Sequence, residues 1–322
     1  MLDPRCSFHS LYAFLIAFLL SSWACGATEE VMLDTDLGPL SGTLTVPESS
    51  PPRALVLFIS GSGPTDRNGN IMGLLGQNNS LKYLSDALLS KGYATLRFDK
   101  RLIGKSTSRQ MSENDLRIET YIKDVKLWIS YAKEQLDVPI YILGHSEGAL
   151  IGMVAAQETD VAGFISLAGP GRKASELILS QVRPQFPSAL FAQTQYIVGE
   201  FLAGRTVASL PKGLAMMFRE SVQPYLISWF KYDPAEELAK LEIPALLIYG
   251  DTDVQVPTSD GALLQAAKPS AEFSVIAGMN HVLKSVDKGN MKAQIASYSE
   301  AGLPLADGLV ERILVFLRAD LK

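Results

Sequence analysis

Ser146 stands between two glycines in residues 144–148, which read Gly-His-Ser-Glu-Gly and fit the pattern Gly-x-Ser-x-Gly. The pentapeptide follows the apolar run 141–143 and precedes an apolar segment typical of a helix. A serine in such a strand–turn–helix setting projects from a tight turn as a nucleophile, and the glycines remove side chains that would collide there. The sequence therefore predicts that Ser146 attacks a substrate carbonyl.

A serine hydroxyl is a weak nucleophile at neutral pH and needs a base beside it, most often a histidine. The chain has three histidines, His9, His145 and His281. His9 lies in the predicted leader described below. His145 is adjacent to the serine on a sharp turn, so we expect its side chain to point elsewhere. His281, just past the predicted strand 273–276, is therefore the predicted base.

A carboxylate should orient the histidine and stabilise the imidazolium. Asp251 and Asp253 both follow the predicted strand 245–249, and either gives the chain order Ser, Asp, His. We favour Asp253, because Gly250 lets the chain turn and a residue farther beyond the strand is better placed to reach His281. Asp251 is expected to accept backbone N–H bonds within the loop.

Acyl transfer also requires N–H donors for the negative oxygen of the tetrahedral intermediate. The backbone of Glu147, the residue after the serine, is expected to supply one. The loop 60–64 (Ser-Gly-Ser-Gly-Pro) is expected to supply the other, with Ser62 as first choice and Gly63 as second. The side chain of Glu147 either faces the site or pairs with a nearby cation.

Alternating strands and helices are predicted to carry these residues. A β-hairpin is expected over residues 31–46, a strand buried on both faces at 54–60, and further strands at 94–98, 140–143, 161–167, 245–249 and 273–276. Helices are expected after Ser80 as N-cap, and over residues 118–136, 148–157 and 309–317. This alternation predicts an α/β fold with a mostly parallel sheet and helices on both faces.

The stretch 172–231 interrupts this alternation. It has no convincing buried strand, many aromatic residues and helix-like apolar spacing, and it is far longer than most connections. We expect a helical cap over residues 172–231, inserted into a core formed by residues 28–171 and 232–322.

Several segments together resemble a bacterial branch of the α/β-hydrolases that is related to the serine aminopeptidase-like hydrolases and includes carboxylesterases. They are residues 61–70 (GSGPTDRNGN), 97–106 (RFDKRLIGKS), 144–148 (GHSEG) and 279–281 (MNH). The acid loop also resembles that of many α/β-hydrolases, since Gly250, Asp253, Val256 and Pro257 fit Gly-x-x-Asp-x-x-Val-Pro. The resemblance covers most of residues 30–170 and 234–320.

The resemblance implies an α/β-hydrolase fold and a Ser-His-Asp mechanism that uses no cofactor. It also implies esterase activity on short acyl groups. The chain departs from the family at Leu102, where a glycine is expected in the turn.

The first 27 residues are typical of a secretory signal peptide, with Arg5, a short apolar run at 11–20 and small residues after it. The run is shorter than the roughly 20 residues of a spanning helix. We therefore expect an exported protein, periplasmic or secreted. A retained leader, or a lipid on Cys25 in Ala24-Cys25-Gly26, would be its only membrane contact.

The amino-acid composition argues against three classes of function: nucleic-acid binding, thiol chemistry and metal binding. The net charge of −5 and the lack of a basic cluster argue against nucleic acid as a partner. Both cysteines, Cys6 and Cys25, lie in the predicted leader, so no disulfide or thiol chemistry is expected. Three histidines leave little for a zinc site, so no metal is expected.

The residues together predict a serine hydrolase that cleaves small carboxylic esters through an acyl-serine. A peptidase or thioesterase would use the same residues and is an alternative. A non-catalytic exported binding protein on the same fold is another, although it would have no reason to keep all three residues.

Overall fold

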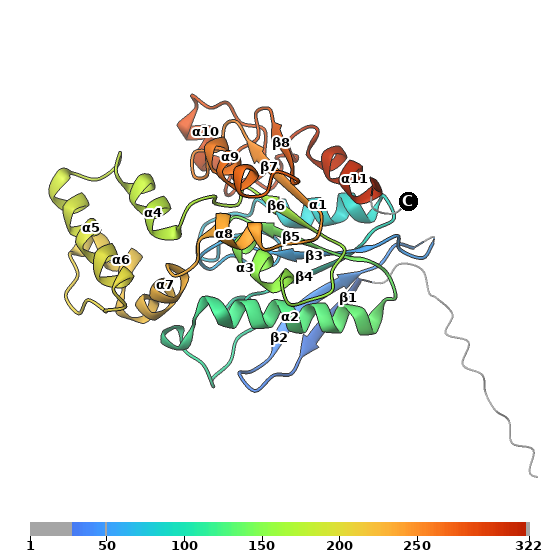
Figure 1. The fold of residues 1–322 in the computed structure, drawn as a ribbon, viewed down its shortest axis with the longest axis horizontal. Coiled ribbons are helices and arrows are strands. Elements are labelled where there is room, and N and C mark those ends of the chain that lie inside the picture. Colours follow the sequence, from blue (N-terminus) through green and yellow to red (C-terminus); the bar gives the residue numbers. More distant parts are fainter. Residues whose placement is uncertain (1–27, 49, 320–322) are drawn as a thin grey trace, which may run out of the picture.

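The computed structural model describes residues 28–48 and 50–319 (Figure 1). Within them, eight strands form one sheet in the order β1-β2-β4-β3-β5-β6-β7-β8. Strand β2 runs antiparallel to β1 and β4, and every other neighbouring pair is parallel. The strands are β1 (Thr28–Leu33), β2 (Leu40–Thr45), β3 (Leu55–Ile59), β4 (Ala94–Phe98), β5 (Ile140–His145), β6 (Gly163–Leu167), β7 (Ala245–Gly250) and β8 (Glu272–Ile276).

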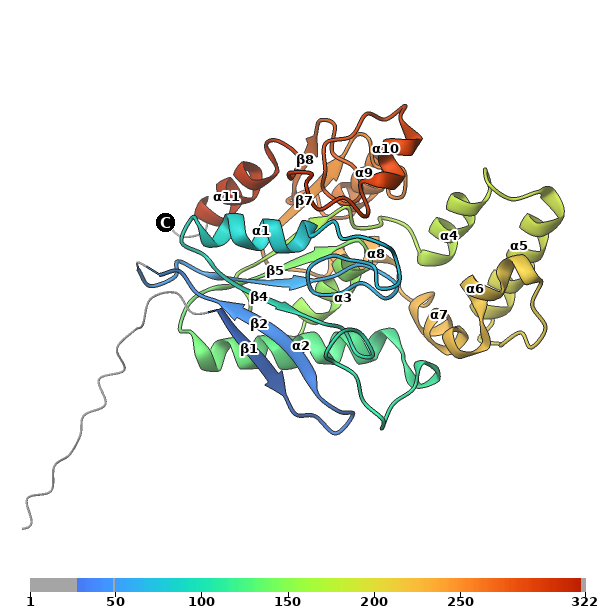
Figure 2. The same ribbon diagram turned by 180° about the vertical axis from the view of Figure 1, so that it is seen from behind.

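Helices cover both faces of this sheet (Figures 1 and 2). Those packed on the sheet are α1 (Ser80–Leu89), α2 (Ile118–Gln135), α3 (Glu147–Ala156), α8 (Pro234–Ala239), α9 (Thr258–Ala267) and α11 (Leu309–Ala319), while α10 (Met291–Ala296) follows β8. Helices α1 and α11 share one face, and α2, α3, α8 and α9 share the other. The expected α/β fold is confirmed.

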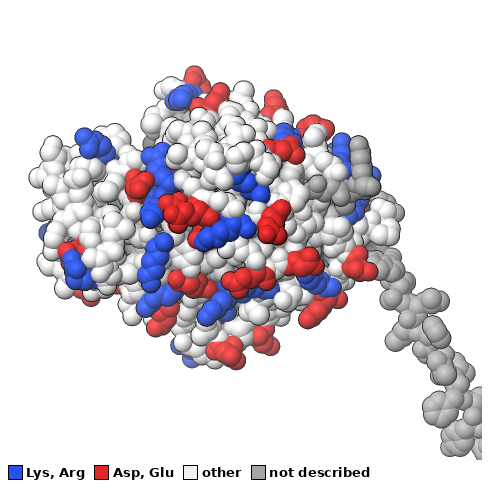
Figure 3. All heavy atoms as spheres, viewed as in Figure 1, with Lys and Arg blue, Asp and Glu red and all other residues white. Residues whose placement is uncertain are grey.

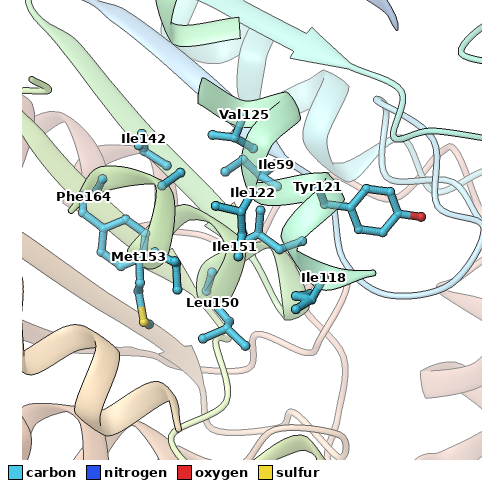
Figure 4. Packing of buried hydrophobic residues seen from close by; sticks show 14 of the residues in the cluster. Ile59, Ile118, Tyr121, Ile122, Val125, Ile142, Leu150, Ile151, Met153 and Phe164 are labelled. Carbon is cyan, nitrogen blue, oxygen red and sulfur yellow. The ribbon is translucent and has the colours of Figure 1, made fainter. Parts of the chain in front are cut away.

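Alternation along β3 explains why this strand is apolar throughout. Leu55, Leu57 and Ile59 belong to the core beneath α2 and α3, whereas Val56 and Phe58 belong to the core beneath α1 and α11. Successive side chains of a strand point to opposite faces, so a strand covered on both sides must be apolar at every position. Figure 4 shows the first of these cores, in which residues of β3, β5 and β6 meet α2 and α3.

A lobe of helices lies at one end of the sheet (Figures 1 and 2). Its members come between β6 and β7 and are α4 (Ala174–Val182), α5 (Ser188–Leu202), α6 (Ala215–Phe218) and α7 (Gln223–Trp229). Three single 3₁₀ turns also occur, Glu113–Asp115, Lys212–Leu214 and Glu220–Val222. The aromatic residues of this lobe pack on one another, as Phe201 does on Phe218 and Phe230.

The structure differs from the expected elements in two respects. Helix α1 begins at Ser80, but its N-cap is Asn79, which has a left-handed φ of 51° and makes no side-chain capping bond. The helices α8, α9 and α10 were not expected. Helices α8 and α10 have only six residues each, and α9 buries an aspartate, a glycine and a single leucine, so its sequence shows no clear apolar stripe. The predicted leader lies outside the described residues.

Charged side chains of both signs are interspersed over the face in Figure 3, and neither sign gathers into a large patch there. Within the described ranges, no helix is long and apolar enough to cross a membrane. The same ranges hold no group of three or more His, Cys, Asp or Glu side chains arranged for a metal ion.

Lys284 is fully buried without a carboxylate partner in the described residues. Its Nζ donates to the Leu303 carbonyl at 2.6 Å and lies over the Tyr83 ring, and burial lowers its pKa to about 8. The folded state therefore binds this proton less tightly than the unfolded chain does. The Lys284 contribution to the free energy of unfolding should rise between about pH 8 and its usual pKa near 10.5.

We expect Lys284→Met to be more stable than the wild type near pH 7, because it removes a desolvated charge. The stability difference should shrink as the pH approaches 10. Urea denaturation of both proteins at pH 7 and pH 9.5 measures this. A variant that is less stable at both values would show that the bond to Leu303 outweighs the burial of the charge.

Candidate active site

Ser146 lies at the junction of β5 and α3, at the carboxyl end of the central strands. Its φ of 54° and ψ of −123° belong to a sparsely populated backbone region. The N–H of Ser146 donates to the Leu167 carbonyl at 2.9 Å, which ties the turn to β6. This is the strained strand-to-helix turn that the sequence pattern predicts.

The two flanking glycines are required by close contacts with backbone. A Cβ on Gly144 would lie 2.3 Å from the Gly148 carbonyl oxygen, and one on Gly148 would lie 2.4 Å from the Ile59 carbonyl oxygen. Neither backbone atom can move without disturbing helix α3 or the central sheet. The glycines therefore permit both the tight turn and the packing of α3 against β3.

His281 and Asp253 come together although 28 positions separate them in the chain. The Nδ1–H of His281 donates to Asp253 Oδ2 at 2.7 Å, and both side chains are buried. The other carboxylate oxygen, Oδ1, accepts from the backbone N–H groups of Gln255 and Val256 at 2.7 and 2.9 Å. The carboxylate is therefore held on one side by its own loop and presents the other side to the histidine.

Asp251 takes a different role, since its Oδ1 accepts the backbone N–H of Gly278 at 2.7 Å. This bond joins the loop after β7 to the loop after β8, which carries His281. The structure thus brings Asp253, and not Asp251, to the histidine. The reason is the position of each residue in the loop. The chain turns back at Gly250, so only the third residue beyond it lies opposite His281.

The place of His145 on the turn led us to expect that its side chain points away from the site. The structure shows the opposite. Its Nε2–H donates to the His281 carbonyl at 2.8 Å, and the two rings lie 4.9 Å apart. Burial and the neighbouring His281 lower the pKa of His145 to about 3, so it is neutral near pH 7. It therefore anchors the backbone of the residue expected to act as base.

The predicted oxyanion donors lie around the same serine. In the described part of the chain, the backbone N–H groups of Ser62, Gly63 and Glu147 make no hydrogen bond. Glu147 is the first residue of α3, where such orphan N–H groups point along the helix axis and favour negative charge. Ser62 lines the pocket of Ser146, whereas Gly63 lines only the neighbouring cavity, so the geometry favours Ser62.

The side chain of Glu147 pairs with a cation, one of the two alternatives that the sequence left open, and the cation is Lys100. Lys100 Nζ donates to Glu147 Oε1 at 3.1 Å and to the Gly61 carbonyl at 2.5 Å, and it lies over the Tyr121 ring. Both ionic side chains are almost fully buried. One ammonium group therefore joins the loop that carries Ser62 to the helix that begins at Glu147. No local pattern signals this, because the partners come from three segments.

Two hollows meet at the oxyanion loop. The catalytic pocket, about 60 Å³, is lined by Ser146, His281 and His145 together with Ser62, and by residues of the loops around them. A larger cavity of about 330 Å³ lies on the other side of Ser62. Its walls include Lys100 and Glu147 and, from α7 of the helical lobe, Tyr225, Leu226 and Trp229.

Leu102 lines the larger cavity and has a φ of 66°, in the left-handed region that favours glycine. The turn thus has the backbone that the expected glycine would adopt, and the leucine side chain is accommodated in it. Its neighbours in the loop pair with separate distant groups, Arg101 with Asp124 and Asp99 with Arg67.

Comparisons with known proteins agree with this fold. The serine aminopeptidase, S33, family matches residues 71–217. Esterase EstD of Thermotoga maritima is 28% identical over 284 residues, which cover 84% of this chain and 63% of EstD. The chain therefore spans less than two thirds of that relative's length.

Solved structures match over most of the chain. Est1E from Butyrivibrio proteoclasticus, solved with ferulic acid, has a TM-score of 0.58 at 19% identity and covers 90% of this chain and 96% of its own. The Pyrococcus furiosus esterase Pf2001 has a TM-score of 0.58 at 17% identity and covers 92% of this chain and 94% of its own. With the mostly parallel sheet and the serine turn between β5 and α3, these matches show that the chain has the α/β-hydrolase fold.

Proposed function

We propose that this protein is a serine hydrolase that cleaves carboxylic esters. The observation that carries the proposal is the hydrogen bond from His281 Nδ1 to Asp253 Oδ2, next to a serine on a strained turn in the same pocket. The similarity to Esterase EstD supports an ester as substrate.

The proposed reaction begins when Ser146 Oγ attacks the ester carbonyl. His281 Nε2 takes the hydroxyl proton, because Asp253 fixes the tautomer that protonates Nδ1. The N–H groups of Ser62 and Glu147 hold the oxyanion, with Gly63 as the second choice for the loop donor. His281 then gives the proton to the leaving alcohol, and water releases the acid from the acyl-serine.

The cavity beneath α7 is the proposed site of the acyl group. It adjoins the catalytic pocket at Ser62, and Glu147 lies in its wall, so a carbonyl oxygen held by these two residues directs its acyl chain into it. The lobe of α4–α7, within the proposed cap of residues 172–231, closes this cavity with apolar side chains. The proposed reaction needs no metal or cofactor.

Leu226→Ala should change acyl chain-length preference more than it changes turnover of an acetate ester. The side chain is buried in the cavity wall, and its removal opens space for a longer chain. The ratio of kcat/KM for octanoate over acetate p-nitrophenyl esters should rise on the order of tenfold, as expected for a few additional buried methylenes. Equal losses on both esters would instead assign α7 a structural role.

A fluorophosphonate probe tests the proposed function most directly. We expect stoichiometric labelling of the pure protein at Ser146, located by peptide mass spectrometry. Absence of labelling would favour a non-catalytic binding protein on this fold. A panel of esters, thioesters and aminoacyl anilides then separates an esterase from a thioesterase or a peptidase, since all three share the acyl-serine.

We also propose that the protein is exported. This rests on the leader pattern of residues 1–27, which lie outside the described residues. Mass spectrometry of the protein isolated from its native cells should find a mature N-terminus near residue 28, and an intact leader would contradict the proposal.

A further inference from the structure

A groove with exposed apolar side chains adjoins the catalytic pocket and shares no lining residue with the cavity under α7. It has a volume of about 370 Å³, and no charged residue lines it. Its apolar side chains come from the loop before α1, from the loop after β7 and from α10; they are Leu74, Leu75, Val254, Met291 and Ile295. Leu75 is 94% exposed and Ile295 is 67% exposed. Such a cluster on a protein surface calls for a ligand, because isolated apolar residues are ordinary but contiguous ones are not.

The groove adjoins the catalytic pocket. Gln255 and Tyr298 line both hollows, and the amide of Gln255 donates to the hydroxyl of Tyr298. Burial, and then the charge of Asp253, raise the pKa of Tyr298, so the phenol stays uncharged. Two neutral polar side chains, bonded to each other, therefore stand between the catalytic pocket and the groove.

The position of the groove beside the acid loop indicates which part of an ester the groove would bind. Gln255 follows Asp253 in the acid loop, and its backbone N–H holds the carboxylate that orients His281. In acyl transfer the histidine delivers its proton to the oxygen of the leaving alcohol. The chain attached to that oxygen must therefore leave the serine on the histidine side. The residues of the expected oxyanion donors, Ser62 and Glu147, line the cavity under α7, and neither lines the groove.

We propose that this groove binds the alcohol part of the substrate, and that the substrate is an ester of an uncharged, apolar alcohol. This inference rests on the proposed function and adds the chemical class of the leaving group. The acyl and alcohol arms would then lie in separate hollows. The lining is unsuited to a phosphorylated alcohol, because no cationic partner for the phosphate is present among the groove residues.

Two series of esters test the assignment. In the first, acetate is joined to methyl, butyl and hexyl alcohol; in the second, methyl alcohol is joined to acetic, butanoic and hexanoic acid. We expect kcat/KM of the wild type to rise along the alcohol series, by up to about fourfold for each methylene that becomes fully buried. Once an acetyl-enzyme forms, its hydrolysis rate should be the same for every acetate.

The double variant Leu75→Ser/Ile295→Ser changes two exposed side chains of the groove. It should lower the hexyl-to-methyl acetate ratio on the order of tenfold, since apolar contact area is lost, and leave the ratio for methyl hexanoate over methyl acetate as in the wild type. The matched control is Leu127→Ser/Val315→Ser, which changes two exposed apolar residues on α2 and α11, away from the groove. In the control variant, the hexyl-to-methyl acetate ratio and the methyl hexanoate-to-acetate ratio should both equal those of the wild type.

Several outcomes would overturn the inference. A flat alcohol series in an active wild type would show that the groove takes no leaving group, while leaving ester hydrolysis itself in place. If the groove variant instead changes the ratio of kcat/KM for methyl hexanoate over methyl acetate, the groove binds the acyl chain. A wild-type dimer that the groove variant converts to a monomer would assign it to a second copy of the chain. If the wild type hydrolyses no ester in either series, the proposed function fails and the inference fails with it.

Discussion

Ser146→Ala should lower kcat/KM for any ester by roughly 10⁴ to 10⁶, as is typical when the nucleophile of a serine hydrolase is removed. The expected loss is large because no other hydroxyl can replace Ser146 Oγ at the end of β5. Alanine retains a Cβ, so the backbone requirement at this left-handed position is the same as for serine. The melting temperature should therefore stay close to that of the wild type.

Esterase assays and thermal unfolding of Ser146→Ala measure both quantities. Ser130→Ala is a suitable control, because Ser130 is an exposed serine of α2 whose hydroxyl bonds only to the Lys126 carbonyl. The control should retain activity and react with a fluorophosphonate, whereas Ser146→Ala should not react. If Ser146→Ala keeps more than about a tenth of the activity, this serine is not the nucleophile.

Asp253→Asn should lower kcat by about 10² to 10⁴, by analogy with the tautomer error in serine proteases. The asparagine oxygen can still accept from the N–H groups of Gln255 and Val256, which directs its amide nitrogen toward His281 Nδ1. An amide nitrogen donates, so His281 must accept at Nδ1 and carry its proton at Nε2. In that tautomer the histidine cannot remove the serine proton.

Asp251→Asn is the matched comparison for this change. Its side-chain oxygen can still accept the Gly278 N–H, so kcat should remain within about threefold of the wild type, a difference below about 1 kcal/mol. Steady-state kinetics with one ester, together with thermal unfolding of both variants, decide which aspartate orients His281. The reverse pattern, with the larger loss in Asp251→Asn, would move the catalytic acid to Asp251.

Local patterns in the sequence determined the fold class. The strands β3, β5 and β7 are recognisable as apolar runs because helices cover both of their faces. Helix α2 has an apolar stripe because one of its sides packs on the sheet while the other is in water. Helices α8 and α10 escaped prediction because a helix of six residues contains too few turns for a periodic pattern to develop, and α9 because it buries no apolar stripe.

Chain order and chemistry also determined much of the candidate site. Ser146 was found from its glycine pattern, and His281 by elimination among three histidines. The preference for Asp253 over Asp251 came from loop geometry and from the resemblance to other acid loops. Each of these inferences needs only a short segment of chain or a count of residues.

Only the tertiary structure decided how distant segments meet around Ser146. Lys100 joins the loop of Gly61 to Glu147, His145 holds the carbonyl of His281, and the groove beside Tyr298 gathers residues from three parts of the chain. Such contacts leave no local pattern, because their spacing in the sequence is set by the lengths of the intervening helices and strands. The physical reason is that the carboxyl ends of parallel strands lie along one edge of the sheet, where loops that are remote in sequence become neighbours.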